Sequence, residues 1–211
     1  MLVEGRVGPV VGADGSVNQI SLDRTGAQRI SAAHGEWWEG ASRGNVFYGC
    51  TAVAGVDHAA SLTTTAPFAL YNPAGSDVDL SVLSLSMGYI SGTLGSGTVV
   101  ASAYIESSTN AAPTGTAIVA GSTRLGLGTP KGKPLTTVTL TAGALIMFPL
   151  WDIDAKLAST AVQNLALPID LHGVIIVTPG TALVLAGIAG AAGTTPRVVF
   201  GCVWEEIARA A

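Results

Sequence analysis

Short apolar or alternating runs follow one another from Val46 to the end of the chain, and glycine, proline, asparagine or aspartate closes each of them. Half-buried strands alternate apolar and polar side chains, and the turns between them need those four residue types. Helical periodicity is nearly absent. The pattern predicts an all-β fold, an antiparallel β-sandwich of which a jelly roll is one form. A chain of 211 residues is long enough for one such core.

Residues 1–45 differ from the rest of the chain, with several arginines, two adjacent tryptophans and turn signals at Asp14-Gly15 and Arg24-Thr25-Gly26. We expect this segment to form an extended arm or short hairpins. Residues 46–211 are expected to form the β-sandwich domain.

The clearest strand prediction covers Val78 to Ile90. Its apolar residues change parity near Val82-Leu83, so a β-bulge there would keep both sets facing the core. The glycine-rich stretch 92–97 predicts a turn. Residues 98–106 are then expected to pair with the strand 78–90 as its antiparallel neighbour.

Further turns and strands are expected toward the C-terminus. Thr178-Pro179-Gly180 predicts a tight reversal between two apolar runs. Residues 197–207 predict a last strand that is covered on both faces, because apolar residues occupy both parities. Residues 154–164 fit a helix or a loop equally well, and residues 109–134 predict a long exposed connection with one short strand around 117–120.

Charged residues make up 11% of the chain, where a typical soluble domain has about a quarter. Surface charge is a main defence against self-association. We therefore expect a homo-oligomer, with a trimer favoured. The net charge of −4 and the lack of any basic run argue against nucleic-acid binding. The longest apolar stretch, residues 182–192, is shorter than the roughly 20 residues of a membrane span.

No catalytic motif stands out, and we expect no enzymatic activity and no cofactor. The three histidines, His34, His58 and His172, lie outside any nucleophile motif. Cys50 and Cys202 are too far apart in sequence for typical zinc-ligand spacing, and both are expected to be buried thiols.

Two acidic pairs, Asp77/Asp79 and Asp152/Asp154, have the alternate spacing with which carboxylates can chelate calcium. Because a calcium cage needs further oxygen ligands, a role at strand ends and turns is the simpler interpretation. Glu205-Glu206 is expected to end the last strand in solvent.

Trp37 and Trp38 are the candidate interface residues. Large aromatic side chains contribute strongly to protein interfaces and to carbohydrate stacking. Three roles stay open for them: a place in the core, a contact between subunits, or a platform for a ligand.

Several phrases are similar to those of poorly characterised virion-associated structural proteins of tailed phages. They are Arg43-Gly44-Asn45-Val46-Phe47, the segment 70–76 (LYNPAGS), the segment 88–97 (GYISGTLGSG), Thr178-Pro179-Gly180 and Val203-Trp204-Glu205-Glu206. The resemblance spans about residues 41–207 and rests on turns and strands. It implies a symmetric oligomer of β-sandwiches in a capsid, tail or fibre, and it implies no catalytic residues.

Residue pattern and resemblance together predict a virion structural protein, most simply a capsid decoration or cement protein that binds the major capsid protein or other virion proteins. The absence of a secretory signal fits assembly in the host cytoplasm. The alternative is a tail-fibre or receptor-binding, lectin-like module that engages host glycans through exposed aromatics and residues 109–134.

Overall fold

The structure is a computed structural model that describes residues 36–57, 63–92, 97–126, 128–153, 168–189 and 197–209. The chain divides into two compact units, Met1–Trp38 and Glu39–Ala211. The sheets belong to the second unit. A short helix, α1 (Trp38–Arg43), precedes the first strand; the sequence pattern did not predict it.

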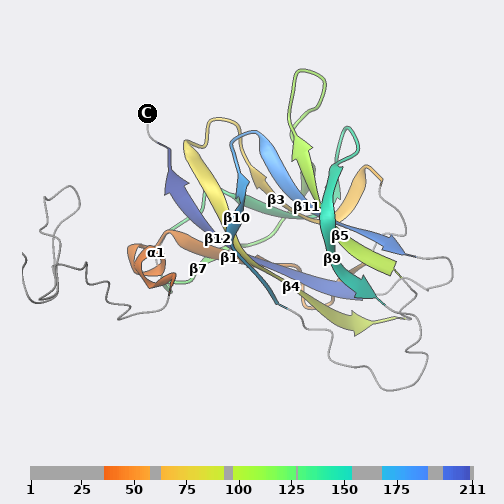
Figure 1. Cartoon of the computed structure of the whole chain (residues 1–211), viewed down its shortest axis with the longest axis horizontal. Helices are drawn as coiled ribbons and strands as arrows, with labels where there is room; N and C mark the ends of the chain where they lie inside the picture. Colours follow the sequence, from red (N-terminus) through yellow and green to blue (C-terminus); the bar gives the residue numbers. More distant parts are fainter. Residues whose placement is uncertain are drawn as a thin grey trace, which may run out of the picture. The chain divides into compact units, whose positions relative to one another are not determined.

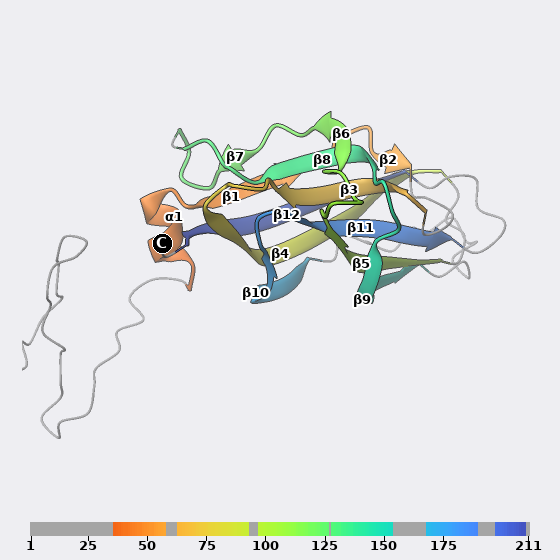
Figure 2. The same cartoon turned by 90° about the horizontal axis from the view of Figure 1, so that it is seen from above.

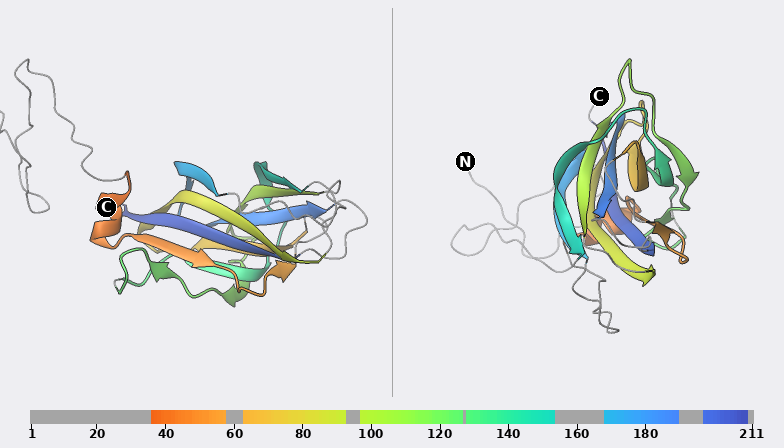
Figure 3. Two further views of the ribbon diagram at one scale, coloured as in Figure 1. Left: turned by 90° about the horizontal axis from the view of Figure 1, so that it is seen from below. Right: turned by 90° about the vertical axis from the view of Figure 1, so that its right-hand side faces the viewer.

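Two six-stranded antiparallel sheets form the second unit (Figures 1 and 2). The first has the order β10 (Ile169–Val177), β4 (Val78–Ser91), β12 (Arg197–Ala208), β1 (Val46–Cys50) and β7 (Gly121–Ser122), with β2 (Val56–Asp57) also paired to β12. Figure 3 shows this sheet from its face, with β10 at one edge. The second has the order β6 (Thr114–Ala117), β8 (Lys133–Thr139), β3 (Thr65–Asn72), β11 (Thr181–Ala189), β5 (Gly97–Ile105) and β9 (Leu145–Ile153).

The two sheets share one apolar core, which confirms the predicted antiparallel β-sandwich. Phe200 and Trp204 of β12 pack with Phe68 of β3 and Leu185 of β11, and none of these four side chains is exposed. Phe47 and Trp204 lie with their ring centroids 6.1 Å apart. The strand order does not identify a jelly roll.

A bulge in β4 confirms the change of parity seen in the sequence. Ser84 pairs with Val203 and Val82 pairs with Trp204, so Leu83 is the extra residue between two pairs. The insertion lets Val82 and Leu85 both enter the core, although they have opposite parity.

The predicted pairing of β4 with residues 98–106 is wrong. β4 pairs with β10 and β12, whereas β5 pairs with β9 and β11 in the other sheet. A glycine-rich turn allows the chain either to reverse within a sheet or to cross to the opposite sheet. Here β12 matches β4 over almost its whole length, so β5 joins the opposite layer.

The turn at residues 178–180 is confirmed, with the Thr181 amide donating to the Thr178 carbonyl at 3.1 Å. It also connects the two sheets, because β10 and β11 belong to different ones. The last strand is confirmed as β12, but Val199 and Val203 on its outer face are only half-buried. Residues 154–164 lie outside the described part of the chain.

The connection 109–134 contains two short strands, β6 and β7, which flank residues 118–120. The single strand expected around 117–120 was therefore misplaced. β6 and β7 are short, and each is an edge strand of a different sheet.

The outer face of the second sheet is buried as well. Ala69, Val184 and Ser102 have no exposed surface and belong to this face. The Tyr104 hydroxyl donates to the Ala111 carbonyl at 2.6 Å and lies 2.6 Å from the Thr141 hydroxyl oxygen. These bonds hold the connections after β5 and β8 over the sheet, which explains why alternation is weak in β3, β5 and β11.

Candidate functional site

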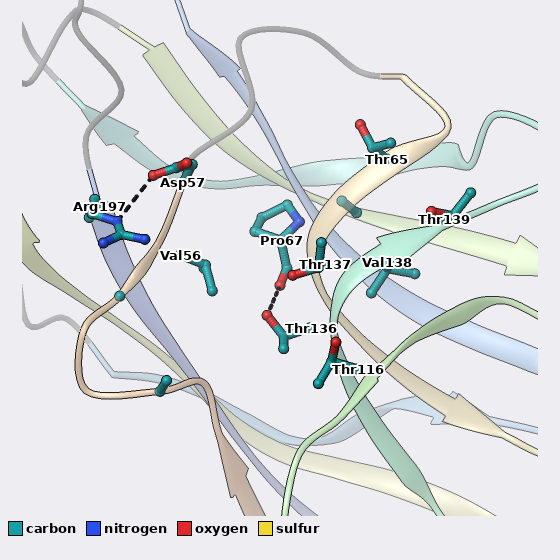
Figure 4. A pocket seen from close by; sticks show the side chains of 13 residues that line it. Val56, Asp57, Thr65, Pro67, Thr116, Thr136, Thr137, Val138, Thr139 and Arg197 are labelled. Carbon is teal, nitrogen blue, oxygen red and sulfur yellow. Dashed lines mark hydrogen bonds and ion pairs between the residues drawn. The ribbon is translucent and has the colours of Figure 1, made fainter.

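A cavity of about 530 Å³ opens beside one end of the sandwich, and threonine is the commonest residue in its lining (Figure 4). We call it the threonine pocket. Its walls come from β2, from the first residues of β3, and from β6, β8 and the first residue of β12. The lining residues are Ala52, Gly55, Val56, Asp57, Thr65, Ala66, Pro67, Thr116, Thr136, Thr137, Val138, Thr139 and Arg197.

The pairing of β8 with both β3 and β6 brings the threonines together. Thr65 pairs with Thr139, and Thr116 pairs with Thr136. The Thr136 hydroxyl donates to the Pro67 carbonyl at 3.0 Å. Among the described residues, the hydroxyls of Thr116, Thr137 and Thr139 form no hydrogen bond, so they are available to a ligand in the pocket.

Thr137 has an unusual backbone conformation at this place. Its φ of 53° lies in the left-handed region, which is strongly unfavourable for a β-branched residue. Such a conformation costs on the order of 1–3 kcal/mol and persists where the surrounding structure imposes it. Strained residues of this kind cluster at binding sites.

An ion pair borders the pocket. The Arg197 Nε lies 3.2 Å from Asp57 Oδ1, and the backbones of the two residues are paired between β12 and β2. The side chains are about half exposed, and an exposed pair adds little to stability. Its consequence here is that the Asp57 carboxylate balances the charge of the arginine at the border of the pocket.

A second surface feature is an apolar patch on the open edges of both sheets. β9 and β10 are the terminal strands of their sheets, and Figure 2 shows both on the same side of the sandwich. We call the exposed apolar residues of these two strands, together with Ile105 at the end of the neighbouring β5, the edge patch: Ile105, Leu145, Ile146, Met147, Val174 and Ile176. Ile105, Met147 and Ile176 line one small cavity of about 170 Å³, so the two edges are neighbours.

Trp37 is half-buried and Trp38 is 48% exposed. They belong to the first unit, at the boundary with the second. The first turn of α1 carries Glu39, whose carboxylate binds Arg43 at 2.7 Å. Neither tryptophan is among the residues of the threonine pocket or the edge patch, so their proposed interface role stays a prediction.

The acidic pairs do not form a cluster in the described residues. Asp79 lies 3.6 Å from the Arg209 guanidinium, and Asp77 occupies a turn with a φ of 59°. Asp152 lies in β9, and Asp154 is outside the described part of the chain. Within the described ranges no group of three His, Cys, Asp or Glu residues could hold a metal ion.

Glu206 is not simply solvated, as the sequence had suggested. Its carboxylate accepts hydrogen bonds from the backbone amides of Lys131 and Gly132, both at 2.8 Å, and from the Trp204 indole at 3.3 Å. A Cβ on Gly132 would lie 2.9 Å from Leu80, so glycine is needed for this close approach. Burial raises the pKa of the neighbouring Glu205.

The cysteines differ from each other. Cys202 is buried in the core, as predicted, and burial raises the pKa of its thiol strongly. Cys50 is exposed, which corrects the prediction, because its side chain lies on the outer face of β1. His172 sits at a bulge of β10 with a φ of 48°, whereas His34 and His58 lie outside the described residues.

Sequence reasoning missed the threonine pocket. Its threonines are far apart in the sequence, at positions 65, 116 and 136–139, and no local motif connects them. Only the pairing of β8 with two other strands shows that they converge.

Comparisons of the chain with protein-family models, with curated proteins and with solved structures find no match. In the described residues, no helix is long and apolar enough to cross a membrane.

Proposed function

We propose that this chain is a structural subunit of a virion, a capsid decoration or cement protein that acts as a homo-oligomer. The observation that carries the proposal is the edge patch. The sequence resemblance to virion proteins suggests that the chain belongs to a tailed phage. There such a subunit would add contact area across neighbouring capsid proteins. No catalytic role is included in the proposal.

The residues of the edge patch are strongly exposed for apolar side chains. Val174 is 83% exposed, Leu145 76% and Ile105 62%. Ile105, Met147 and Ile176 of three different strands are adjacent, because they line one cavity. Exposed apolar side chains that gather in one place mark protein interaction sites.

A second copy of the same chain is the occupant that we propose for the patch. Among the described residues β9 and β10 each pair with one strand only, so an added strand can pair with the backbone N–H and C=O groups on their outer sides. The six patch residues carry no charge, so two like copies meet without like-charge repulsion. In a ring of three, β9 of each copy can meet β10 of the next, and both open edges are then covered.

Lysine substitution tests the self-association. Val174→Lys places a charge in the patch, and Val53→Lys is the matched control because Val53 is 87% exposed and lies outside it. We expect the natural chain to sediment at a multiple of its 21.1 kDa mass, three times in the favoured case, and Val174→Lys to sediment as a monomer. The proposal would be contradicted if the natural chain sediments as a monomer, or if Val174→Lys and Val53→Lys sediment at the same mass.

The virion setting needs its own experiment. A tagged copy imaged on purified particles should decorate the head at regular positions. Deletion of residues 1–45 should reduce that association, because we propose that this segment reaches neighbouring subunits. Particles that never carry the protein would remove the virion role and leave the self-association untouched.

A receptor-binding or tail-fibre module that engages host glycans is the second candidate. It is favoured by the connection 109–134, in which Val119 is 94% and Leu125 85% exposed. Exposed apolar side chains on long connections are common in recognition surfaces. Loss of glycan-array binding in Trp37→Ala or Trp38→Ala would support this candidate over a purely structural role.

A further inference from the structure

We propose that the threonine pocket binds a neutral saccharide. The inference does not depend on the assembly proposed above, and it gives the glycan-binding candidate a defined site. It rests on the size of the cavity, on the unpaired hydroxyls that line it and on the balanced charge at its border.

The cavity has the size of a ligand site. Its volume of about 530 Å³ falls within the roughly 300–1,000 Å³ that is typical of small-molecule pockets. One or two sugar rings fit such a volume. The cavity at the edge patch, about 170 Å³, is much smaller.

The hydroxyls favour a ligand that both donates and accepts hydrogen bonds. A threonine hydroxyl has one donor and two acceptor positions, as does a sugar hydroxyl. Thr116, Thr137 and Thr139 come from two strands and border one space (Figure 4). Pro67 and Val56 add apolar surface, against which the C–H face of a sugar ring can pack.

Charge selects against an anionic ligand. The one arginine among the lining residues is Arg197, and the Asp57 carboxylate lies 3.2 Å from its Nε. An anion would have to compete with that carboxylate for the guanidinium. A neutral polyol can instead accept from the free N–H groups of Arg197 and donate to Asp57, using both members of the pair.

The strained backbone of Thr137 is consistent with a prearranged site. Its φ of 53° is held between Thr136, whose hydroxyl is bound to Pro67, and Val138, which is 1% exposed. Both neighbours are therefore fixed, and the Thr137 side chain borders the cavity without needing to rearrange when a ligand binds. Prearranged groups lose less entropy on binding.

Calorimetry and saturation-transfer NMR on the full chain test the proposal. The probes are the methyl glycosides of glucose, galactose, mannose and N-acetylglucosamine and their short oligomers. Thr139→Val replaces a hydroxyl by a methyl group inside the pocket. Thr129→Val is the matched control, because Thr129 is exposed in the connection before β8 and is not a lining residue.

We expect at least one probe to bind with a dissociation constant below about 1 mM. Thr139→Val should weaken that binding roughly five- to tenfold, the equivalent of one hydrogen bond, and Thr129→Val should leave it unchanged. Absence of binding by every probe, or equal weakening in both variants, would overturn the site. Sedimentation of the same variants keeps this outcome separate from self-association, which neither substitution should alter.

Discussion

Asn72 connects the two sheets at the end of β3. Its side chain is fully buried, and its amide donates to the Val78 and Val177 carbonyls, both at 2.8 Å. These carbonyls belong to β4 and β10 in the other sheet. The Ser76 hydroxyl donates to the Asn72 side-chain oxygen. The phrase LYNPAGS, which the sequence offered only as a resemblance, therefore forms a corner between the layers.

Asn72→Ala should lower the free energy of unfolding by about 3 kcal/mol, because two buried carbonyls lose the Asn72 amide and the Val78 carbonyl keeps only the longer bond from the Ser76 hydroxyl, at 3.3 Å. Urea denaturation measures the change. Asn110→Ala is the control: the Asn110 amide also donates to a carbonyl, that of Ile105, but at an exposed site, so we expect a loss below about 1 kcal/mol. Equal losses in the two variants would show that Asn72 has no special role.

Tyr71 makes stability depend on pH at the alkaline end. Burial, together with its hydrogen bond to Glu106 at 2.7 Å, raises the pKa of the tyrosine to about 12. An unfolded tyrosine loses its proton near pH 10. Between these values the unfolded chain releases a proton that the folded chain retains, so stability falls as pH rises from about 10 to 12.

Tyr71→Phe should make this alkaline loss smaller, because the group that titrates is gone. Thermal unfolding of both proteins at several pH values between 8 and about 12 would measure the difference. Parallel curves for the two proteins would contradict the assignment. At pH 8 the variant should be less stable, since the hydrogen bond to Glu106 is lost.

At the scale of elements, the β4 bulge determines which residues face the core. Val78, Leu80 and Val82 lie on one side of Leu83, and Leu85 and Met87 lie on the other. Because strand side chains alternate with a period of two, the extra residue Leu83 brings these two sets of opposite parity to the same face, and one further inserted residue turns one set outward.

Insertion of one alanine between Ser84 and Leu85 should therefore abolish the native fold, because it turns Leu85 and Met87 outward, whereas Leu83→Ala keeps the residue count and should cost about 2–4 kcal/mol. Dispersion of the amide NMR spectrum distinguishes the two outcomes. An insertion variant that is as stable as Leu83→Ala would show that β4 can change its register without penalty.

At the scale of the whole molecule, the burial of both faces of one sheet explains the high apolar content of the chain. The second sheet buries both of its faces, one against the first sheet and one under its own connections. Such a sheet needs apolar residues at both parities, which raises the apolar content of a chain of this length. The low share of charged residues is a separate feature. It matters for self-association at the edge patch, where none of the six residues is charged.

Local sequence predicted the strands well because their signal is local. Alternation reports which side of a strand is buried, and the residues at turns report where the chain can reverse. The strand 78–90, its bulge, the turn 178–180 and the last strand could all be derived in this way. The helix α1 was not predicted, because six residues are too few to show a helical periodicity.

The sequence by itself determined that this protein is an antiparallel β-sandwich, since side-chain parity and turn chemistry are properties of neighbouring residues. Tertiary structure alone decided which strands are partners, as the separation of β4 from β5 demonstrates. It also brought Thr65, Thr116 and Thr139 around one cavity and left β9 and β10 as open edges. Pairing between distant strands depends on how well whole strands match and cover each other, and no local pattern contains that information.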